Sequence, residues 1–189
     1  MADYTNGIQG YFDREIDTIR KLNIGEINEA MNALLDARNR GAVIWVMGNG
    51  GSAATASHFV CDFSKGLSEV LKGRKFDLRC LSDNTPIVMA IANDISFEDV
   101  FLFQMEGLVK PGDLVIAISG SGNSMNVVKA VEYARQQGAK AICLTGYSGG
   151  KLKALADYTL HVPLNDMQIV EDIHMMFDHM MMKVMGESK

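Results

Sequence analysis

Apolar residues recur with helical spacing in the first part of the chain. They form one stripe over residues 3–21 and a second over residues 26–40, with Gly25 between them. Gly41 follows the second stripe, where a glycine commonly ends a helix. The pattern predicts two helices with a break at Gly25, which together form a helical N-terminal arm over residues 1–40.

After Gly41 the apolar residues instead occur in short continuous runs. These runs cover residues 42–47, 113–119, 141–145 and 158–163, with a weaker one at 78–82. Such runs, rich in β-branched residues, are typical of strands that are buried on both faces of a parallel sheet. Helical stripes follow the runs, and the last begins near Asp166. We therefore expect an α/β fold with a five-stranded parallel sheet flanked by helices.

No linker or low-complexity segment interrupts this alternation. The sequence therefore predicts a single domain over residues 1–189. Its α/β core would occupy residues 41–189 and follow the helical arm directly.

Three loops rich in glycine and serine follow predicted strands. They are residues 48–52 (GNGGS), 119–124 (SGSGNS) and 145–150 (TGYSGG). Ligands of open α/β sheets bind at this edge, where glycines allow close approach and helix N-termini attract anions. The first loop lacks the lysine of GxxxxGK[ST] and the spacing of GxGxxG, which argues against a P-loop or a dinucleotide site. Serines in two of these loops predict a phosphate site built from hydroxyls and backbone amides.

Composition and charge narrow the classes of partner. The net charge of −5, without a lysine or arginine block, argues against nucleic-acid binding. The longest apolar run, residues 42–47, is too short to span a bilayer, and the N-terminal residues show no secretory signal. Three cysteines without a CxxC pair are typical of reduced thiols. We therefore expect a cytoplasmic protein that binds neither nucleic acid nor membrane.

Histidines and carboxylates on two predicted helices are candidates for metal binding and acid–base chemistry. His58 and Asp62 are four residues apart on the helix after the first loop, so they share a face. On the last helix both Glu171 and Asp172 are candidates to join His179, and helical geometry alone does not choose between them.

The other two histidines favour structural roles. His174 and Asp178 form a second pair spaced by four residues, on a different face of the last helix. We expect them to serve packing or a subunit contact. His161 lies at the end of a predicted strand, where a hydrogen-bonded structural histidine is the simplest interpretation.

Four segments carry a resemblance to a known family. Residues 48–59, 117–130 and 144–152 resemble the sugar isomerase (SIS) domain, and residues 170–180 (VEDIHMMFDHM) resemble its phosphoheptose isomerase group. The resemblance implies a flavodoxin-like three-layer sandwich and a homotetramer. It also implies isomerisation of sedoheptulose 7-phosphate to D-glycero-D-manno-heptose 7-phosphate through an enediol, for lipopolysaccharide or capsule heptose.

The resemblance also assigns roles to residues. It implies a metal, Zn²⁺ with Mn²⁺ or Fe²⁺ as alternatives, held by His58, Asp62, Glu171 and His179. Asp62 and His179 would exchange the protons. The substrate would contact Asn49, Gly50, Gly51, Ser52, Asn93, Asp94, Ser119, Gly120, Ser121, Ser124 and Glu171. The family usually has Glu in place of Asp62 and Gln in place of Glu171, so we expect a retained but retuned site.

Two other functions stay open from the sequence. One is a non-enzymatic SIS protein, either a phosphosugar-binding module or an adaptor that binds the replication initiator DnaA. The other is an isomerase of another ketose phosphate. An adaptor has no obvious use for His58 and His179, so these residues favour an enzyme.

Methionines are concentrated at the end of the chain. Seven of the 13 lie within the last 23 residues, on a helix that would be apolar on most sides. Such a helix requires extensive burial, and methionine suits irregular contacts. We expect neighbouring subunits to supply that burial, so that the assembled oligomer completes the active site.

Overall fold

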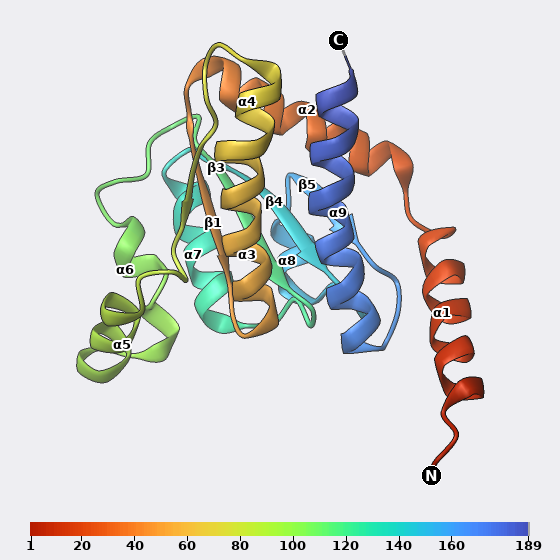
Figure 1. Cartoon of the computed structure of the whole chain (residues 1–189). Helices are drawn as coiled ribbons and strands as arrows, with labels where there is room; N and C mark the ends of the chain where they lie inside the picture. The colour runs from red at the N-terminus through yellow and green to blue at the C-terminus, as the bar shows by residue number, and fades with distance from the viewer. Residues whose placement is uncertain (189) are drawn as a thin grey trace.

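The computed structural model describes residues 1–188, and its centre is a five-stranded parallel sheet (Figure 1). The strands are β1 (Val43–Gly48), β2 (Asp77–Cys80), β3 (Leu114–Ser119), β4 (Lys140–Thr145) and β5 (Tyr158–His161). They lie in the order β2-β1-β3-β4-β5, and every neighbouring pair is parallel. The predicted five-stranded parallel sheet is confirmed.

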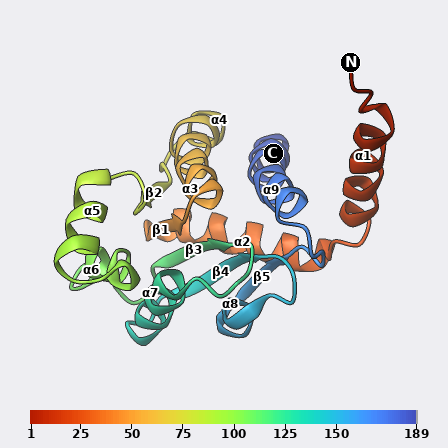
Figure 2. The ribbon, with the colours of Figure 1, turned by 90° about the horizontal axis from the view of Figure 1, so that it is seen from below.

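Helices cover both faces of the sheet and produce three layers (Figure 2). One face carries α2 (Ile24–Arg40), α3 (Gly51–Cys61), a π-helix (Asp62–Leu67), α4 (Ser68–Leu71) and α9 (Met167–Glu187). The other carries α5 (Thr85–Asp94), a 3₁₀ turn (Phe97–Asp99), α6 (Leu102–Met105), α7 (Met125–Gln136) and α8 (Gly150–Leu155). Alternate strand residues enter two separate cores. Ile44 and Ile116 share one core with residues of α3 and α9, whereas Trp45 and Val115 share the other with residues of α5, α6 and α7.

The N-terminal helices differ from the prediction in two ways. The break between α1 (Thr5–Ile19) and α2 lies before Gly25, because the Asn23 side chain accepts hydrogen bonds from the Gly25 and Glu26 amides and caps α2. In addition, α2 buries residues such as Ala30 and Leu34 against the sheet, so it belongs to the core. Only α1 projects from the body as an arm (Figures 1 and 2).

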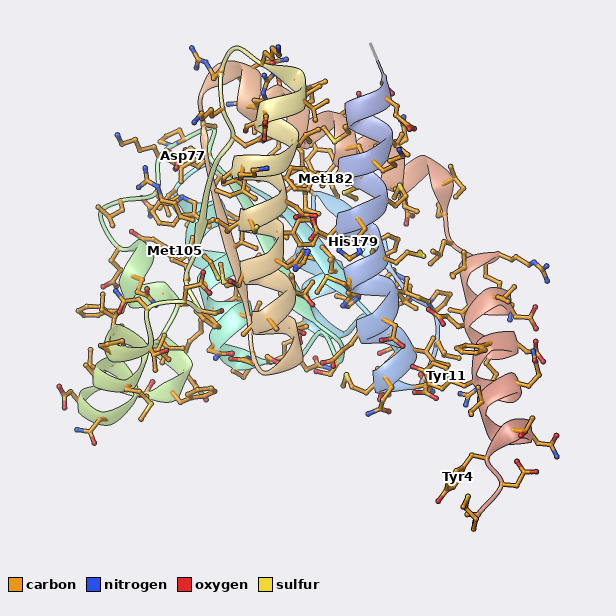
Figure 3. The ribbon with its side chains drawn as sticks, in the orientation of Figure 1. Tyr4, Tyr11, Asp77, Met105, His179 and Met182 are labelled. Carbon is orange, nitrogen blue, oxygen red and sulfur yellow. The ribbon has the colours of Figure 1, made fainter. Side chains whose placement is uncertain are left out.

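The arm contacts the body through α9. The Tyr11 hydroxyl donates a hydrogen bond to the Asp172 carboxylate, and the Arg14 guanidinium pairs with Asp166 at 2.7 Å. Figure 3 shows Tyr11 pointing from α1 toward the start of α9. The polar contacts of α1 therefore reach the same helix that carries Glu171 and His179.

The methionines of α9 are only partly covered within one chain. Met181 and Met185 are buried, and the others are half-buried: Met167, Met175, Met176, Met180 and Met182. Their burial by neighbouring subunits stays a prediction. Neither α9 nor any other helix within residues 1–188 is long and apolar enough to cross a membrane.

Candidate active site

The loops after β1 and β3 meet at the point where the strand order reverses. The chain passes from β1 to β2 on one side and then crosses to β3 on the other side of β1, and open α/β sheets form a ligand crevice at such a reversal. The side chains of Asn49 and Asn126 join the two loops through two reciprocal hydrogen bonds of 2.9 Å. Sequence reasoning did not single out Asn126, because its position at the start of a helical stripe carries no signal for this contact.

A pocket opens between these loops and the start of α9, and we call it the loop pocket. It is lined by Asn49, Ser52, Ile118, Ser119, Gly120, Ser121, Ser124, Met167 and Glu171. The structure thus gathers seven of the predicted substrate residues, and the lining contains no lysine or arginine.

Hydroxyls and backbone amides dominate the loop pocket. The Ser119 and Ser124 hydroxyls lie 3.0 Å apart. Ser124 precedes α7, yet its side chain caps none of the helix amides. Because α3 and α7 both begin at the pocket, their free N-terminal N–H groups provide partial positive charge there. The arrangement suits a phosphate group held without a charged side chain.

Glycine residues shape the entry to α3. Gly50 has a φ of 52°, which a residue with a Cβ adopts only with strain. A Cβ on Gly51 would lie 2.4 Å from the Glu171 carboxylate, so Glu171 rests directly on this glycine. Gly51 therefore lets a carboxylate from α9 reach the loop pocket.

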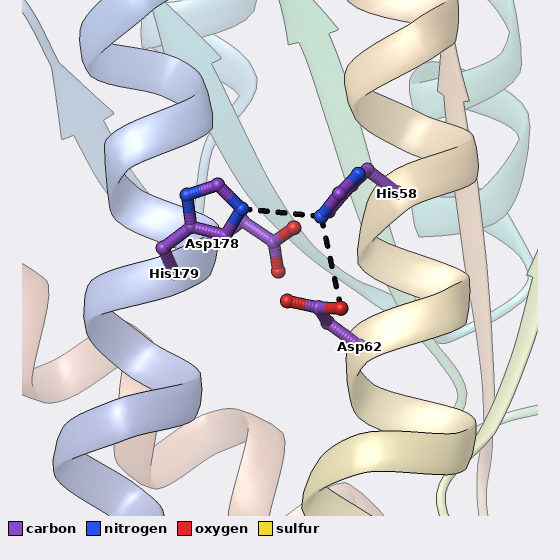
Figure 4. A group of neighbouring side chains, drawn as sticks. All are labelled: His58, Asp62, Asp178 and His179. Atoms are coloured by element: carbon purple, nitrogen blue, oxygen red, sulfur yellow. Dashed lines mark hydrogen bonds and ion pairs between the residues drawn. The ribbon is translucent and has the colours of Figure 1, made fainter.

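Two helices bring a second set of side chains together, which we call the histidine–aspartate group: His58, Asp62, Asp178 and His179 (Figure 4). His58 lies on α3, Asp62 begins the π-helix, and Asp178 and His179 lie on α9. The Nε2 atoms of His58 and His179 are 3.1 Å apart, and His58 Nε2 lies 3.7 Å from Asp62 Oδ1. One ligand atom from each of the four residues lies within 4.8 Å of the others.

The chemistry of the histidine–aspartate group fits a divalent cation. Asp178 is fully buried, and neither of its carboxylate oxygens has a hydrogen-bond partner among residues 1–188. Burial, with a smaller contribution from the Asp62 carboxylate, raises the pKa of Asp178 to about 7. A buried carboxylate without a partner is costly, and a cation among these side chains would compensate it. Two imidazoles and two carboxylates are ligands that Zn²⁺, Mn²⁺ and Fe²⁺ accept.

Asp178 was expected on another face of the helix, paired with His174. Asp178 and His179 are neighbours in sequence, about 100° apart around the helix, and both reach the group. His174 is buried with no hydrogen bond to either ring nitrogen, so the expected side-chain pair does not form. Burial lowers the pKa of His174 to about 4.

Five predicted site residues are placed differently from the expectation: Gly50 and Gly51 shape the entry to α3 without lining the loop pocket, and Glu171, Asn93 and Asp94 lie as follows. Glu171 lines the loop pocket and is absent from the group, because the eight residues to His179 correspond to about 12 Å along α9. Asn93 and Asp94 lie on α5, which α3 separates from α9 (Figures 1 and 2). There the Asn93 amide donates a hydrogen bond to Asp94, and neither residue lines the loop pocket.

His161 has the environment of a structural histidine. It ends β5, and its Nδ1 lies 3.1 Å from the Thr145 hydroxyl, within hydrogen-bond distance. This contact joins the ends of β4 and β5, away from the histidine–aspartate group.

The SIS domain family matches residues 9–146 of the chain. A probable phosphoheptose isomerase of Thermoplasma acidophilum is 41% identical over 167 residues, which cover 88% of this chain and 90% of that protein. A phosphoheptose isomerase of Citrifermentans bemidjiense is 40% identical over 153 residues, or 81% and 79% of the two chains. The structure of phosphoheptose isomerase GmhA from Neisseria gonorrhoeae superposes with a TM-score of 0.88 at 29% identity, covering 97% and 98% of the chains.

Proposed function

This chain belongs to the phosphoheptose isomerase group of the SIS-domain family, and on that premise we propose that it converts sedoheptulose 7-phosphate to D-glycero-D-manno-heptose 7-phosphate. The observation that carries the proposal is the pairing of two sites. An anion pocket without basic side chains lies at the start of α3, and the histidine–aspartate group begins six residues further along that helix, about 9 Å from Ser52. A linear sugar phosphate, with its phosphate at one end and its carbonyl at the other, matches this separation.

The loop pocket would bind the phosphate. Hydroxyls of Ser119, Ser121 and Ser124 would donate hydrogen bonds to its oxygens, and the N-terminus of α7 would add backbone donors. Glu171 reaches the edge of the pocket from α9, and its carboxylate would accept hydrogen bonds from sugar hydroxyls. The phosphate is thereby fixed at one end, and the reacting carbons are directed along α3 toward His58.

Asp62 and His179 are the candidates for the proton transfers. In an aldose–ketose isomerisation a base removes the proton from the carbon next to the carbonyl, and an acid supplies a proton to the carbonyl oxygen. Asp62 Oδ1 faces His58 Nε2 at 3.7 Å, and the second carboxylate oxygen would act as the base. His179 is exposed at the open side of the group, where a substrate oxygen has access to its ring.

The histidine–aspartate group would also hold a divalent cation, with Zn²⁺ as our first choice and Mn²⁺ or Fe²⁺ as alternatives. His58, Asp62 and His179 are the ligands that the family resemblance and the observed clustering both support. A bound cation supplies polarisation of the carbonyl and stabilisation of negative charge on the enediolate oxygen.

We also propose that the protein acts as a homo-oligomer, with a tetramer as the expected state. Apolar side chains on α1 are exposed in the single chain, among them Ile8, Phe12 and Ile16. Figure 3 shows Tyr4 at the outer end of the same arm. Analytical ultracentrifugation measures the state, and activity that falls on dilution would support completion of the site by neighbouring subunits.

The central experiment is a turnover assay with sedoheptulose 7-phosphate. The protein is freed of metal, reloaded separately with Zn²⁺, Mn²⁺ or Fe²⁺, and the aldose product is followed by an aldose-specific oxidation assay or by NMR. We expect conversion with at least one cation. Absence of turnover with all three contradicts the proposal, and turnover of only a shorter ketose phosphate would reassign the substrate.

A further inference from the structure

We propose that Asp178 is the fourth ligand of the cation, in the place that the family resemblance gives to Glu171, and that Glu171 serves the substrate instead. The inference rests on the cation site of the proposed function. It concerns a residue of this chain that faces the group from α9, beside His179 (Figure 4).

The first argument is the environment of Asp178. Its side chain is fully buried, and both carboxylate oxygens lack a hydrogen-bond partner among the described residues. Buried carboxylates are normally paired or bind a metal, because an uncompensated charge in the interior is strongly unfavourable. Within residues 1–188, three side chains are grouped with it as possible cation ligands, His58, Asp62 and His179, each with a ligand atom within 4.8 Å.

The second argument is charge balance. Two neutral imidazoles with the carboxylates of Asp62 and Asp178 carry a net charge of −2, which a divalent cation neutralises. If the cation instead used Glu171 as its second carboxylate, the buried carboxyl group of Asp178 would remain beside the site with no hydrogen-bond partner for either oxygen among the described residues. The set that includes Asp178 therefore leaves no uncompensated charge in the core.

The third argument is the position of Glu171. Its carboxylate rests on Gly51 and lines the loop pocket with the phosphate-binding serines. Glu171 and His179 are eight positions apart, which corresponds to about 12 Å along α9, whereas Asp178 is adjacent to His179. Glu171 is thus placed for a sugar hydroxyl and Asp178 for the cation.

The test compares Asp178→Asn with Glu171→Gln as its matched control. Both variants remove one negative charge from α9 and keep the shape of the side chain. Metal-free full-length proteins are titrated with Co²⁺ in the absence of substrate, and binding is followed by calorimetry and by the visible absorption of the bound ion. We expect Glu171→Gln to keep the affinity and spectrum of the wild type. Asp178→Asn should bind Co²⁺ at least about tenfold more weakly, with an altered spectrum.

A second measurement uses thermal unfolding at pH 8. Without metal, Asp178→Asn should unfold at a temperature equal to or above that of the wild type, because it removes a buried charge that has no partner. Co²⁺ should raise the unfolding temperature of the wild type and of Glu171→Gln, and should raise that of Asp178→Asn much less.

Several outcomes would overturn the inference. They are unchanged Co²⁺ affinity and spectrum in Asp178→Asn, a loss of affinity confined to Glu171→Gln, and no Co²⁺ binding by the wild type. If Asp178→Asn fails to fold, anomalous diffraction from Co²⁺-loaded wild-type crystals decides: an ion bonded to Asp178 supports the inference, and one bonded to Glu171 refutes it. Because none of these readouts uses substrate, a failed turnover assay contradicts the proposed function without touching this result.

Discussion

The loop pocket and the histidine–aspartate group both include residues of α3 and α9 but are built in different ways. The loop pocket gathers residues that directly follow β1 and β3, so strand ends place them and short glycine–serine segments shape them. The histidine–aspartate group joins residues 121 positions apart, and only the packing of α3 against α9 brings His58 to His179. The difference teaches that the loop pocket depends on local turn chemistry, whereas the histidine–aspartate group depends on helix packing.

The largest expected effect comes from a substitution that removes a proposed acid–base side chain and leaves the loop pocket unchanged. His179→Ala should lower kcat by about 10²- to 10⁴-fold, as expected for loss of an acid–base group. Binding of inorganic phosphate should persist, because the loop pocket does not include His179. Steady-state kinetics and phosphate calorimetry measure both quantities. Full activity in this variant would show that α9 does not carry the reacting group.

The reverse test damages only the loop pocket. Ser124→Ala removes one hydroxyl that would donate to the phosphate, and its side chain caps no helix amide, so α7 should remain intact. Loss of one hydrogen bond to a charged group, about 1.5–3 kcal/mol, predicts a rise in KM of about 10- to 100-fold with little change in kcat. Ser188→Ala, far from the loop pocket at the end of the chain, is the control. A KM equal to that of the control would remove Ser124 from the phosphate site.

The burial of His174 on α9 can be tested through the pH dependence of the protein's stability. His174 has its pKa lowered to about 4 by burial, against an ordinary value of 6.5. Between these two pH values the His174 imidazole is protonated in the unfolded chain but not in the folded chain. The free energy of unfolding therefore falls as pH decreases from about 6.5 toward 4. Relative to His174→Gln, which does not titrate, the metal-free wild type should lose about 2 kcal/mol by pH 5.

Thermal unfolding between pH 8 and pH 5 measures this loss. Both proteins retain Asp178, so the difference between their two curves isolates His174. Parallel curves would mean that His174 is protonated in the folded protein, or is not buried in the assembled enzyme.

The smallest expected effect comes from a substitution at Gly51, where the start of α3 meets the Glu171 side chain of α9. Gly51→Ala places a Cβ 2.4 Å from the Glu171 carboxylate, which must move away from the loop pocket. Since this is the flexible end of a side chain, the fold should persist and kcat/KM should fall only several-fold. Gly10→Ala is the control, because a Cβ there meets nothing within 4 Å on exposed α1. Equal kinetics for the two variants would show that the position of Glu171 does not matter to the substrate.

Several elements were predictable because their signals are local. The five apolar runs marked the strands to within two residues. The reason is clearest for the central strands β1, β3 and β4, which are buried along most of their length and must therefore be apolar on both faces. Gly41 ends α2 at a φ of 73°, as its position predicts. The break between the first two helices was misplaced at Gly25, because the Asn23 cap starts α2 two residues earlier.

The candidate site was only partly predictable. His58 and Asp62 could be paired from their spacing on one helix, and the serine loops could be placed at one sheet edge. The spacing along α9 did not show that Asp178, rather than Glu171, joins His58. That outcome depends on how α9 is rotated against α3, which the interior contacts of both helices determine.

The sequence by itself determined the class of the fold, the edge of the sheet at which we propose an anion site and the side chains available for chemistry. These follow from periodicity and from residues adjacent in the chain, where few conformations compete. Only the tertiary structure decided that Asn126 joins the two loops, that Asp178 is buried without a partner and that Glu171 rests on Gly51. The physical reason is that each of these depends on the packing of elements far apart in the chain, which no local pattern encodes.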